Sequence, residues 1–414
     1  MSSSKPHFPR LRHIEVYPIE HEGNPYYYLR DPLEVAARPI MLTPGEFLIA
    51  SLFNGEADMD AIKSNFALEA RGAKPTDEQV MAVLHHLRKN CYLDDAAFRL
   101  RYEEVRQEFH DASIRKAWHA GTAYPIDPDE LREQLDAFYS DPNGASSGDG
   151  ASGSGSLQAV MVPHIDLRVD GPCYTHAYRH LFEQSDAELF VVLGVAHNGG
   201  DDFLIATEKD FETPLGVVKT NKDFVKRWSK RLDKDVCREE FMHRSEHSIE
   251  FQLPFLQHGL KRDFEVVNIL SGSIEYALNY AEQEYRDEMN RTIDALAETL
   301  AEEERKTMLI LSVDLAHMGP KFGDVKRIDD IRANAIRDVD KKMFRVLEAY
   351  DSEATIQLMQ NDLFSRRIDA CGAIYTLMRM LPRLKGKMLS YGQDLQGDSG
   401  SIVTYGCMAF EAVD

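Results

Sequence analysis

Three long apolar segments constrain the fold of this chain more strongly than any other feature. They lie at Leu157–Val162, Leu189–Val195 and Lys306–Val313, far apart in the sequence, and a histidine follows each of them closely. An apolar run of this length is typical of a strand that is covered on both faces, as strands of a parallel sheet are. The three segments therefore predict buried parallel strands.

The rest of the chain beyond residue 116 alternates in character. Candidate helices occupy residues 171–183, 221–232, 276–304, 328–349 and 371–381, and further candidate strands occupy residues 264–269, 387–391 and 401–410. Alternating strands and helices indicate a mostly parallel sheet with helices on both faces. The predicted fold class is therefore α/β with one central sheet.

Residues 1–115 form a unit of a different kind. Helical segments beginning after Thr43 and Thr76 each open with a capping box, in which the threonine is followed three residues later by glutamate or glutamine. Together with a helix between them and a strand or wing at Cys91–Asp95, they predict a small winged-helix-like module. Basic residues are too sparse in it for DNA binding, so we expect it to recognise a peptide or protein partner.

A polar tract rich in glycine and serine interrupts the second unit. It spans residues 140–156 and lacks the Gly-Lys-Ser/Thr sequence of a phosphate-binding loop. Such composition favours a flexible surface loop. We therefore predict a flexible loop at residues 140–156.

Composition excludes several classes of partner. The formal net charge of the 414-residue chain is −21, whereas a nucleic-acid-binding protein needs a clustered basic surface. No apolar stretch reaches the length of a membrane span, and the first residues lack the apolar core of a signal peptide. The five cysteines are widely spaced and form no C-x-x-C pair, which is typical of a reducing compartment. We expect a cytoplasmic protein that binds neither nucleic acid nor membranes.

Potential metal ligands follow the predicted strands. His164 follows the first strand after Pro163, His197 follows the second, and Cys371 precedes the last candidate helix. Strand ends in an open α/β sheet converge on one crevice, histidine is the commonest metal ligand, and a thiol at a helix N-terminus has a depressed pKa. Each residue alone is equally compatible with a capping or core role. Their shared placement predicts a metal site.

Two further groups are candidates for acid/base chemistry. Asp314 and His317 follow the third strand, where a carboxylate can fix the tautomer of an imidazole and raise its basicity; the alternative is an aspartate that only caps a turn. His247 lies one helical turn before Glu250, but the second histidine of an H-E-x-x-H metalloprotease motif is missing.

Six motifs in this order carry a resemblance to a known family. They are residues 119–125 (HAGTAYP), 163–164 (PH), 194–197 (GVAH), 246–250 (EHSIE), 312–317 (SVDLAH) and 371–372 (CG). Residues from about 116 to 414 thereby resemble the Memo family, the B component of the AmmeMemoRadiSam gene cluster. Because residues 116–139 carry the first motif, the resemblance implies one metal-binding domain at residues 116–414 with a flexible insertion at residues 140–156. Two departures stand out: Asn198 replaces a second histidine of many members, and Ala373 begins the segment that replaces the Arg-His-Pro after the family's Cys-Gly.

The resemblance implies a fold similar to that of class III extradiol dioxygenases. It also implies that His164, His197 and Cys371 form a metal-binding triad, with His247, Asp314 and His317 around it. Family members bind iron or copper and take part in redox chemistry. The partners implied are the other components of the cluster, a radical SAM protein and an AMMECR-like protein.

Three classes of function are compatible with these residues. Two imidazoles and a thiolate suit Fe(II), Cu(I) or Zn(II) and leave coordination positions open. The first hypothesis is a non-haem Fe(II) oxidoreductase, with copper or zinc as alternative metals, in which His317 is the acid/base and Asp314 orients it. The second is a non-catalytic module that binds a metal or a peptide and recruits a partner. The third is a hydrolase with Cys371 as nucleophile.

Overall fold

The computed structural model describes residues 8–36, 38–146, 156–279, 283–397 and 399–413. The chain divides into two compact units, Met1–Asp111 and Ala112–Asp414. In the described part of the chain, no helix is long and apolar enough to cross a membrane.

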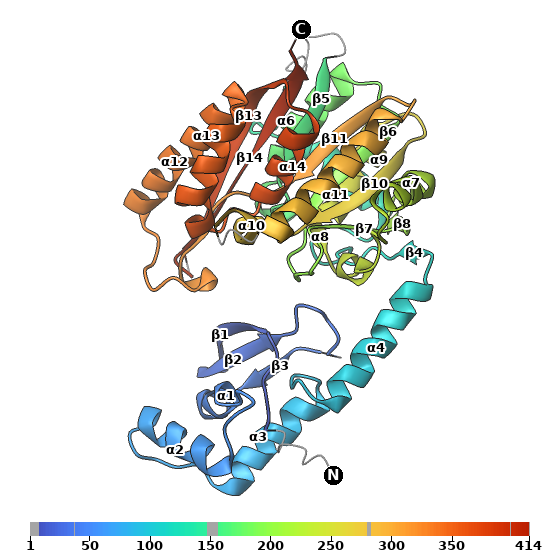
Figure 1. Ribbon diagram of the computed structural model, residues 1–414. Coiled ribbons are helices and arrows are strands. Elements are labelled where there is room, and N and C mark those ends of the chain that lie inside the picture. The colour runs from blue at the N-terminus through green and yellow to red at the C-terminus, as the bar shows by residue number, and fades with distance from the viewer. Residues whose placement is uncertain (1–7, 37, 147–155, 280–282, 398, 414) are drawn as a thin grey trace. The chain divides into compact units, whose positions relative to one another are not determined.

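The first unit combines an antiparallel sheet with four helices (Figure 1). Its elements are β1 (Glu15–His21), β2 (Asn24–Arg30), β3 (Ile40–Leu42), α1 (Pro44–Ser51), α2 (Met59–Glu69), α3 (Asp77–Lys89) and α4 (Ala96–Asp111). Both predicted capping boxes are present, at Thr43 before α1 and at Thr76 before α3. The strand or wing predicted at Cys91–Asp95 is reduced to one bridge between Leu93 and Leu11, and the three-stranded sheet precedes the helices.

The second unit is built on an eleven-stranded sheet within the described residues. Its central strands run parallel in the order β5 (Leu157–Val162), β11 (Thr307–Ser312), β6 (Leu189–Val195) and β10 (Glu265–Ser271). Further strands are β4 (Ile114–Arg115), β7 (Leu204–Ala206), β8 (Asp210–Thr213), β9 (Gly216–Thr220), β12 (His317–Met318), β13 (Leu384–Gln396) and β14 (Ser401–Ala412). The predicted α/β class with a mostly parallel central sheet is confirmed.

Helices cover both faces of this sheet (Figure 1). They are α5 (Pro128–Ser140), α6 (Leu167–Gln184), α7 (Lys222–Leu232), α8 (His247–Glu250), α9 (Gln252–Gly259), α10 (Glu275–Asn279), α11 (Gln283–Ala301), α12 (Asp330–Ala349), α13 (Ser352–Leu358) and α14 (Cys371–Met380). Side chains of a strand alternate between faces. In β6, Val191 and Leu193 belong to one hydrophobic core, whereas Phe190 and Val192 belong to the other. Burial on both faces explains why the strand is apolar throughout.

The first residues of the polar tract, 140–146, have a defined structure. α5 ends at Ser140, and the backbone N–H of Ala145 donates to Thr175 Oγ1 at 2.8 Å. Residues 147–155, which make up most of the predicted flexible insertion, lie outside the described residues.

Candidate metal centre

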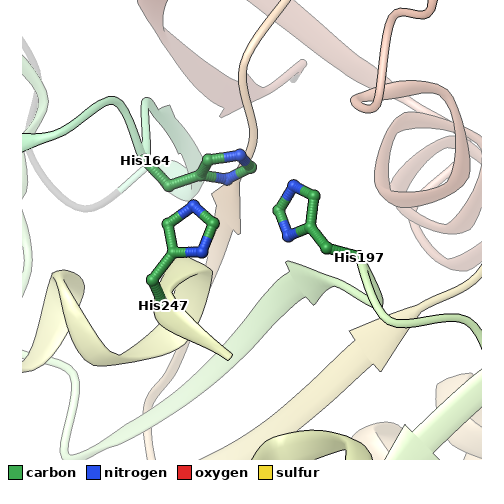
Figure 2. Close-up of side chains that lie close together, drawn as sticks. All are labelled: His164, His197 and His247. Atoms are coloured by element: carbon green, nitrogen blue, oxygen red, sulfur yellow. The ribbon is translucent and has the colours of Figure 1, made fainter. Parts of the chain in front are cut away.

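Three imidazoles meet where β5 and β6 end and α8 begins. One ligand nitrogen from each of His164, His197 and His247 lies within 4.8 Å of the other two (Figure 2). The ring centroids are 5.0 Å apart for His164 and His197, 5.1 Å for His164 and His247, and 4.8 Å for His197 and His247. The parallel sheet thus delivers two of them from the ends of β5 and β6, which flank β11, and α8 adds the third.

The orientation of His164 is fixed by the end of β11. The imidazole is buried, and its Nδ1 lies 3.0 Å from the carbonyl oxygen of Ser312. Because a carbonyl oxygen only accepts hydrogen bonds, Nδ1 keeps a proton and Nε2 is the nitrogen that can bind a metal ion. Asp314 Oδ1 accepts from the backbone N–H groups of His164 and Ile165, at 3.0 and 3.2 Å, and thereby holds the turn after β5.

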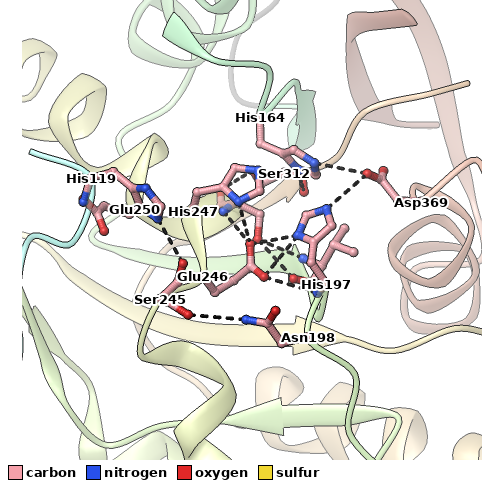
Figure 3. Close-up of polar contacts among 12 residues, drawn as sticks. His119, His164, His197, Asn198, Ser245, Glu246, His247, Glu250, Ser312 and Asp369 are labelled. Carbon is pink, nitrogen blue, oxygen red and sulfur yellow. Dashed lines mark hydrogen bonds and ion pairs between the residues drawn. The ribbon is translucent and has the colours of Figure 1, made fainter. Parts of the chain in front are cut away.

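Glu246 orients His197 in the same way. The buried carboxylate caps the N-terminus of α8, accepting from Ser248 N–H at 2.9 Å, and lies 3.0 and 3.1 Å from Nδ1 of His197 (Figure 3). Nε2 of His197 is therefore directed away from Glu246. The same carboxylate lies 3.3 Å from Nδ1 of His247. One side chain thus positions two of the three imidazoles, as carboxylates behind metal-binding histidines do.

A buried ion pair holds α8 in place. The guanidinium of Arg115 contacts the Glu250 carboxylate, and both side chains are fully buried. Glu250 also accepts from Trp118 N–H at 3.1 Å, from His119 N–H at 2.8 Å and from the hydroxyl of Tyr124. The segment that follows β4 is therefore fastened to the helix that begins with His247.

A glycine allows α8 to approach β6. A Cβ atom on Gly194 would lie 2.6 Å from Ser248 Oγ, a distance that no side chain tolerates. The Ser248 hydroxyl instead accepts from Val195 N–H at 3.0 Å. The end of β6 and the start of α8 can therefore pack closely enough for His197 and His247 to stack.

Asp369 faces two of the imidazoles from the opposite side. Its Oδ1 accepts from the backbone N–H of Asp314 at 2.9 Å, and its Oδ2 lies 3.1 Å from Nε2 of His164 and 3.7 Å from Nε2 of His197 (Figure 3). Oδ2 is buried without a well-aligned hydrogen bond in the described part of the chain. A buried carboxylate oxygen of this kind fits a bound cation.

The carboxylates set the charge of the cluster. Although burial alone would lower it, Asp314 and Asp369 raise the pKa of His164 to about 9. Against the same effect of burial, Glu246 and Asp369 hold the pKa of His197 well above its usual range. Burial and the neighbouring imidazoles hold the pKa of His247 well below its usual range, so that ring is neutral. The donor set of imidazoles and carboxylates fits a divalent transition metal.

Comparison with known proteins shows which family the chain belongs to. A sequence model of the family described as Memo-like protein matches residues 115–409. The chain belongs to the Memo-like family. The match starts at Arg115, so the segment fastened to Glu250 lies inside the Memo-like region. The implied relationship in fold to class III extradiol dioxygenases stays a prediction.

Curated Memo-like relatives differ in how much of the chain they share. A MEMO1 family protein of Aquifex aeolicus is 26% identical over 405 residues, which cover 97% of this chain and 99% of the relative. Relatives from Methanopyrus kandleri and Methanocaldococcus jannaschii are 27% and 30% identical; each covers 70% of this chain, and 96% and 97% of the relative, respectively. Similarity thus extends into the first unit for one relative, beyond the region of the six motifs.

The structure brings only some of the predicted site residues together. His164 and His197 are brought together, and the imidazole that completes the compact group is that of His247, which we predicted as an acid/base. Nδ1 of His317 lies 3.1 Å from the carbonyl oxygen of Leu315, and Asp314 bonds the backbone at His164 instead of orienting His317. The catalytic roles of these residues stay predictions.

Cys371 differs from the prediction in its acidity. It begins α14 as expected, but it is 3% exposed and packs in a hydrophobic core cluster. Burial, followed by the nearby charge of Asp369, raises the pKa of the thiol, so the depressed value expected at a helix N-terminus is wrong. Desolvation outweighs the helix dipole here because the thiol lies beneath the surface.

Two residues of the site were not selected from the sequence. Glu246 directly precedes His247, and Asp369 lies two residues before Cys371. The available signal was an acidic residue beside a candidate ligand at the start of a helix. That signal alone is weak, because acidic residues are common in the first turn of helices.

Proposed function

We propose that this Memo-like protein is a metal-dependent oxidoreductase whose metal, Fe(II) in preference to copper or zinc, binds at the His164–His197 cluster. The observation that carries the proposal is the convergence of three imidazoles, two of which have Nδ1 fixed by an oxygen acceptor so that Nε2 remains for a metal. Bound Fe(II) would supply the one-electron and oxygen chemistry that amino acid side chains lack.

Residues around the cluster are candidates for acid/base chemistry. Nδ1 of His317 donates to a backbone carbonyl, which leaves Nε2 as a proton acceptor. His247 stands beside the two other imidazoles, so we assign it to proton transfer with a substrate bound there. Asp314 preserves the turn that carries His164. We therefore keep His317 and His247 as proposed acid/base groups, whereas for Asp314, which we predicted to orient His317, we propose that it positions His164.

Metal content and oxygen consumption test this function. We expect the protein purified under anaerobic conditions to bind close to one equivalent of Fe(II) and to consume oxygen or transfer electrons only when loaded. His197→Ala should lose the metal, whereas His258→Ala, in the last turn of α9 and ion-paired with Asp136, should retain it. Absence of a stoichiometric transition metal in the wild-type protein would contradict the proposal.

A second candidate function is recruitment of a partner by the first unit. This unit exposes large apolar side chains, with Leu68 81% and Leu100 66% exposed. We propose the radical SAM and AMMECR-like proteins of the AmmeMemoRadiSam cluster as partners, in the cytoplasm, where the five free cysteines would remain reduced. Binding measured between purified proteins, with Leu68→Asp and Leu100→Asp as variants, tests this; equal binding by both variants would contradict it.

A further inference from the structure

The small sheet of the first unit has two free edges. Its strand order is β1-β2-β3 (Figure 1), so within the described residues each outer strand is hydrogen-bonded to a neighbour on one side only. A free edge presents backbone N–H and C=O groups that can pair with another extended chain. The register of the sheet determines which residues present these groups.

The turn between β1 and β2 sets the hydrogen-bond pattern of this sheet. It consists of Glu22 and Gly23, both at positive φ, which is the geometry of a type I′ hairpin turn. His21 and Asn24 flank the turn and therefore form a hydrogen-bonded pair. Hydrogen-bonded and non-hydrogen-bonded pairs alternate along an antiparallel ladder. Tyr28, four positions further along β2, is thus again hydrogen-bonded to β1.

Met41 consequently directs its backbone groups outward from β3. Its partner in β2 is Tyr28, whose own backbone groups point to β1, so the two residues form a non-hydrogen-bonded pair. The N–H and C=O of Met41 therefore point away from β2, and they have no other backbone partner in the described part of the chain. The Met41 side chain is 46% exposed. Met41 thus offers a donor and an acceptor to one residue of an added strand.

The edge of β1 is less suited to an added strand. Pro18, in the middle of β1, is opposite Tyr27 in a non-hydrogen-bonded pair, so its nitrogen lies on the free side and carries no hydrogen. Glu20, the next residue with backbone groups on that side, has an exposed charged side chain. Proline and charged side chains are common means of blocking an edge strand. Of the two edges, that of β3 is therefore the one open to pairing.

We infer that the edge of β3 binds an extended segment of a partner protein through the backbone of Met41. The inference rests on the recruitment function proposed for the first unit and adds a backbone contact to its exposed leucines. On the face of the sheet away from the hydrophobic core, Met41 continues a row formed by Tyr17 and Tyr28, so an apolar partner residue opposite Met41 extends this row. Arg38 is exposed and forms no ion pair among the described residues, so a neighbouring acidic residue complements it.

Short peptides from the proposed partners test this edge. Overlapping fluorescent peptides that cover both partner sequences are titrated with the full-length protein, and binding is followed by anisotropy. We expect a peptide with an apolar residue close to an acidic one to bind. Met41→Pro removes the outward N–H and should weaken binding about five- to tenfold, the usual effect of one hydrogen bond. Met41→Ala keeps the backbone and should lose less. Glu20→Pro, the same change on the edge of β1, should retain the wild-type affinity.

Hydrogen exchange of the Met41 amide gives a readout that needs no variant. It should slow in the wild-type protein when the peptide binds. Unchanged exchange, equal affinity of a folded Met41→Pro variant, or absence of binding by every peptide would overturn the inference. Dimerisation of the wild type that is lost in Met41→Pro would assign the edge to a second copy of the chain instead. Intact partners that bind the wild type and Met41→Pro equally would reject the site but keep the recruitment function, whereas intact partners that do not bind the wild type would reject recruitment itself.

Discussion

At the scale of single residues, Glu246 determines which nitrogen of His197 faces the other two imidazoles of the histidine cluster. Its two oxygens accept from the side chain and backbone of His197 and from Ser248 N–H. In Glu246→Gln, an amide NH₂ replaces one of these acceptors and faces a donor. We expect metal affinity to fall about 10–100-fold, the usual cost of losing the partner of a metal-binding histidine. Anaerobic Co(II) titration measures this.

A matched change at Glu239 serves as the control. Glu239 Oε2 accepts from the backbone N–H groups of Asp201 and Asp202, at 2.9 and 2.8 Å, in the loop after His197, but it bonds no imidazole. Glu239→Gln should therefore retain metal affinity. Equal loss in both variants would mean that loop order, and not the hydrogen bond to His197, supports binding.

His243 predicts a dependence of stability on pH. Burial lowers the pKa of this histidine to about 4, and its Nε2 lies 3.0 Å from the carbonyl oxygen of Ile205. The folded-state pKa lies below the unfolded value of about 6.5, so the unfolded chain binds the proton first as pH falls. The contribution of His243 to the free energy of unfolding is therefore complete above pH 6.5 and is lost as the pH falls towards 4. At about 1.4 kcal/mol per pH unit, the total loss is about 3 kcal/mol.

Denaturant unfolding at a series of pH values tests this contribution. The free energy of unfolding of His243→Gln, in which the amide can still donate to Ile205, should depend less steeply on pH between 6.5 and 4 than that of the wild type. His176→Gln, at a partly exposed position, should retain the wild-type slope. Parallel curves for wild type and His243→Gln would exclude His243 as a source of the acid sensitivity.

At the scale of elements, the ion pair of Arg115 and Glu250 joins β4 to α8 across 135 positions of the sequence. Glu250→Gln leaves a buried guanidinium without its counter-charge, which costs about 3–5 kcal/mol. We expect this loss in the free energy of unfolding, together with weaker metal binding, because α8 carries His247. The charge-free double variant Arg115→Met/Glu250→Leu should be markedly more stable than Glu250→Gln. Additive losses in Arg115→Met, Glu250→Leu and the double variant would contradict a specific pair.

The elements of the sheet could be predicted from sequence to different degrees. The bounds predicted for β5 and β6 are those observed, because strands buried on both faces are apolar at nearly every position. The β1–β2 hairpin was missed, since its two-residue turn uses Glu22 and Gly23 at φ 51° and 75°, a pair that is a weaker turn signal than Asn-Gly.

Only the site residues that directly follow predicted strands could be placed together from the sequence. His164 and His197 could be placed together because parallel strands end at the same edge of a sheet. The contacts of Asp369 depend on how α14 packs against the sheet, and those of Glu250 depend on a segment more than a hundred residues away. Neither relation has a local signature in the sequence.

At the scale of the whole molecule, the second unit contains both the histidine cluster and its own hydrophobic cores. The relatives from Methanopyrus kandleri and Methanocaldococcus jannaschii match this chain over 96% and 97% of their own length while covering only 70% of it, so a Memo-like protein can do without most of the first unit. We therefore expect a fragment of residues 112–414 to fold and to bind Co(II) with the affinity of the full chain, as measured by circular dichroism and anaerobic titration.

A shorter fragment tests whether the second unit needs residues 112–125 to fold and to bind metal. Residues 126–414 retain all three imidazoles but lack Arg115, Trp118, His119 and Tyr124, whose groups contact the buried Glu250 carboxylate. Because an uncompensated buried charge is strongly destabilising, this fragment should unfold at lower denaturant concentration and bind metal more weakly than residues 112–414. Equal behaviour of the two fragments would show that α8 needs no support from the preceding segment; failure of both would place part of the folding unit before residue 112.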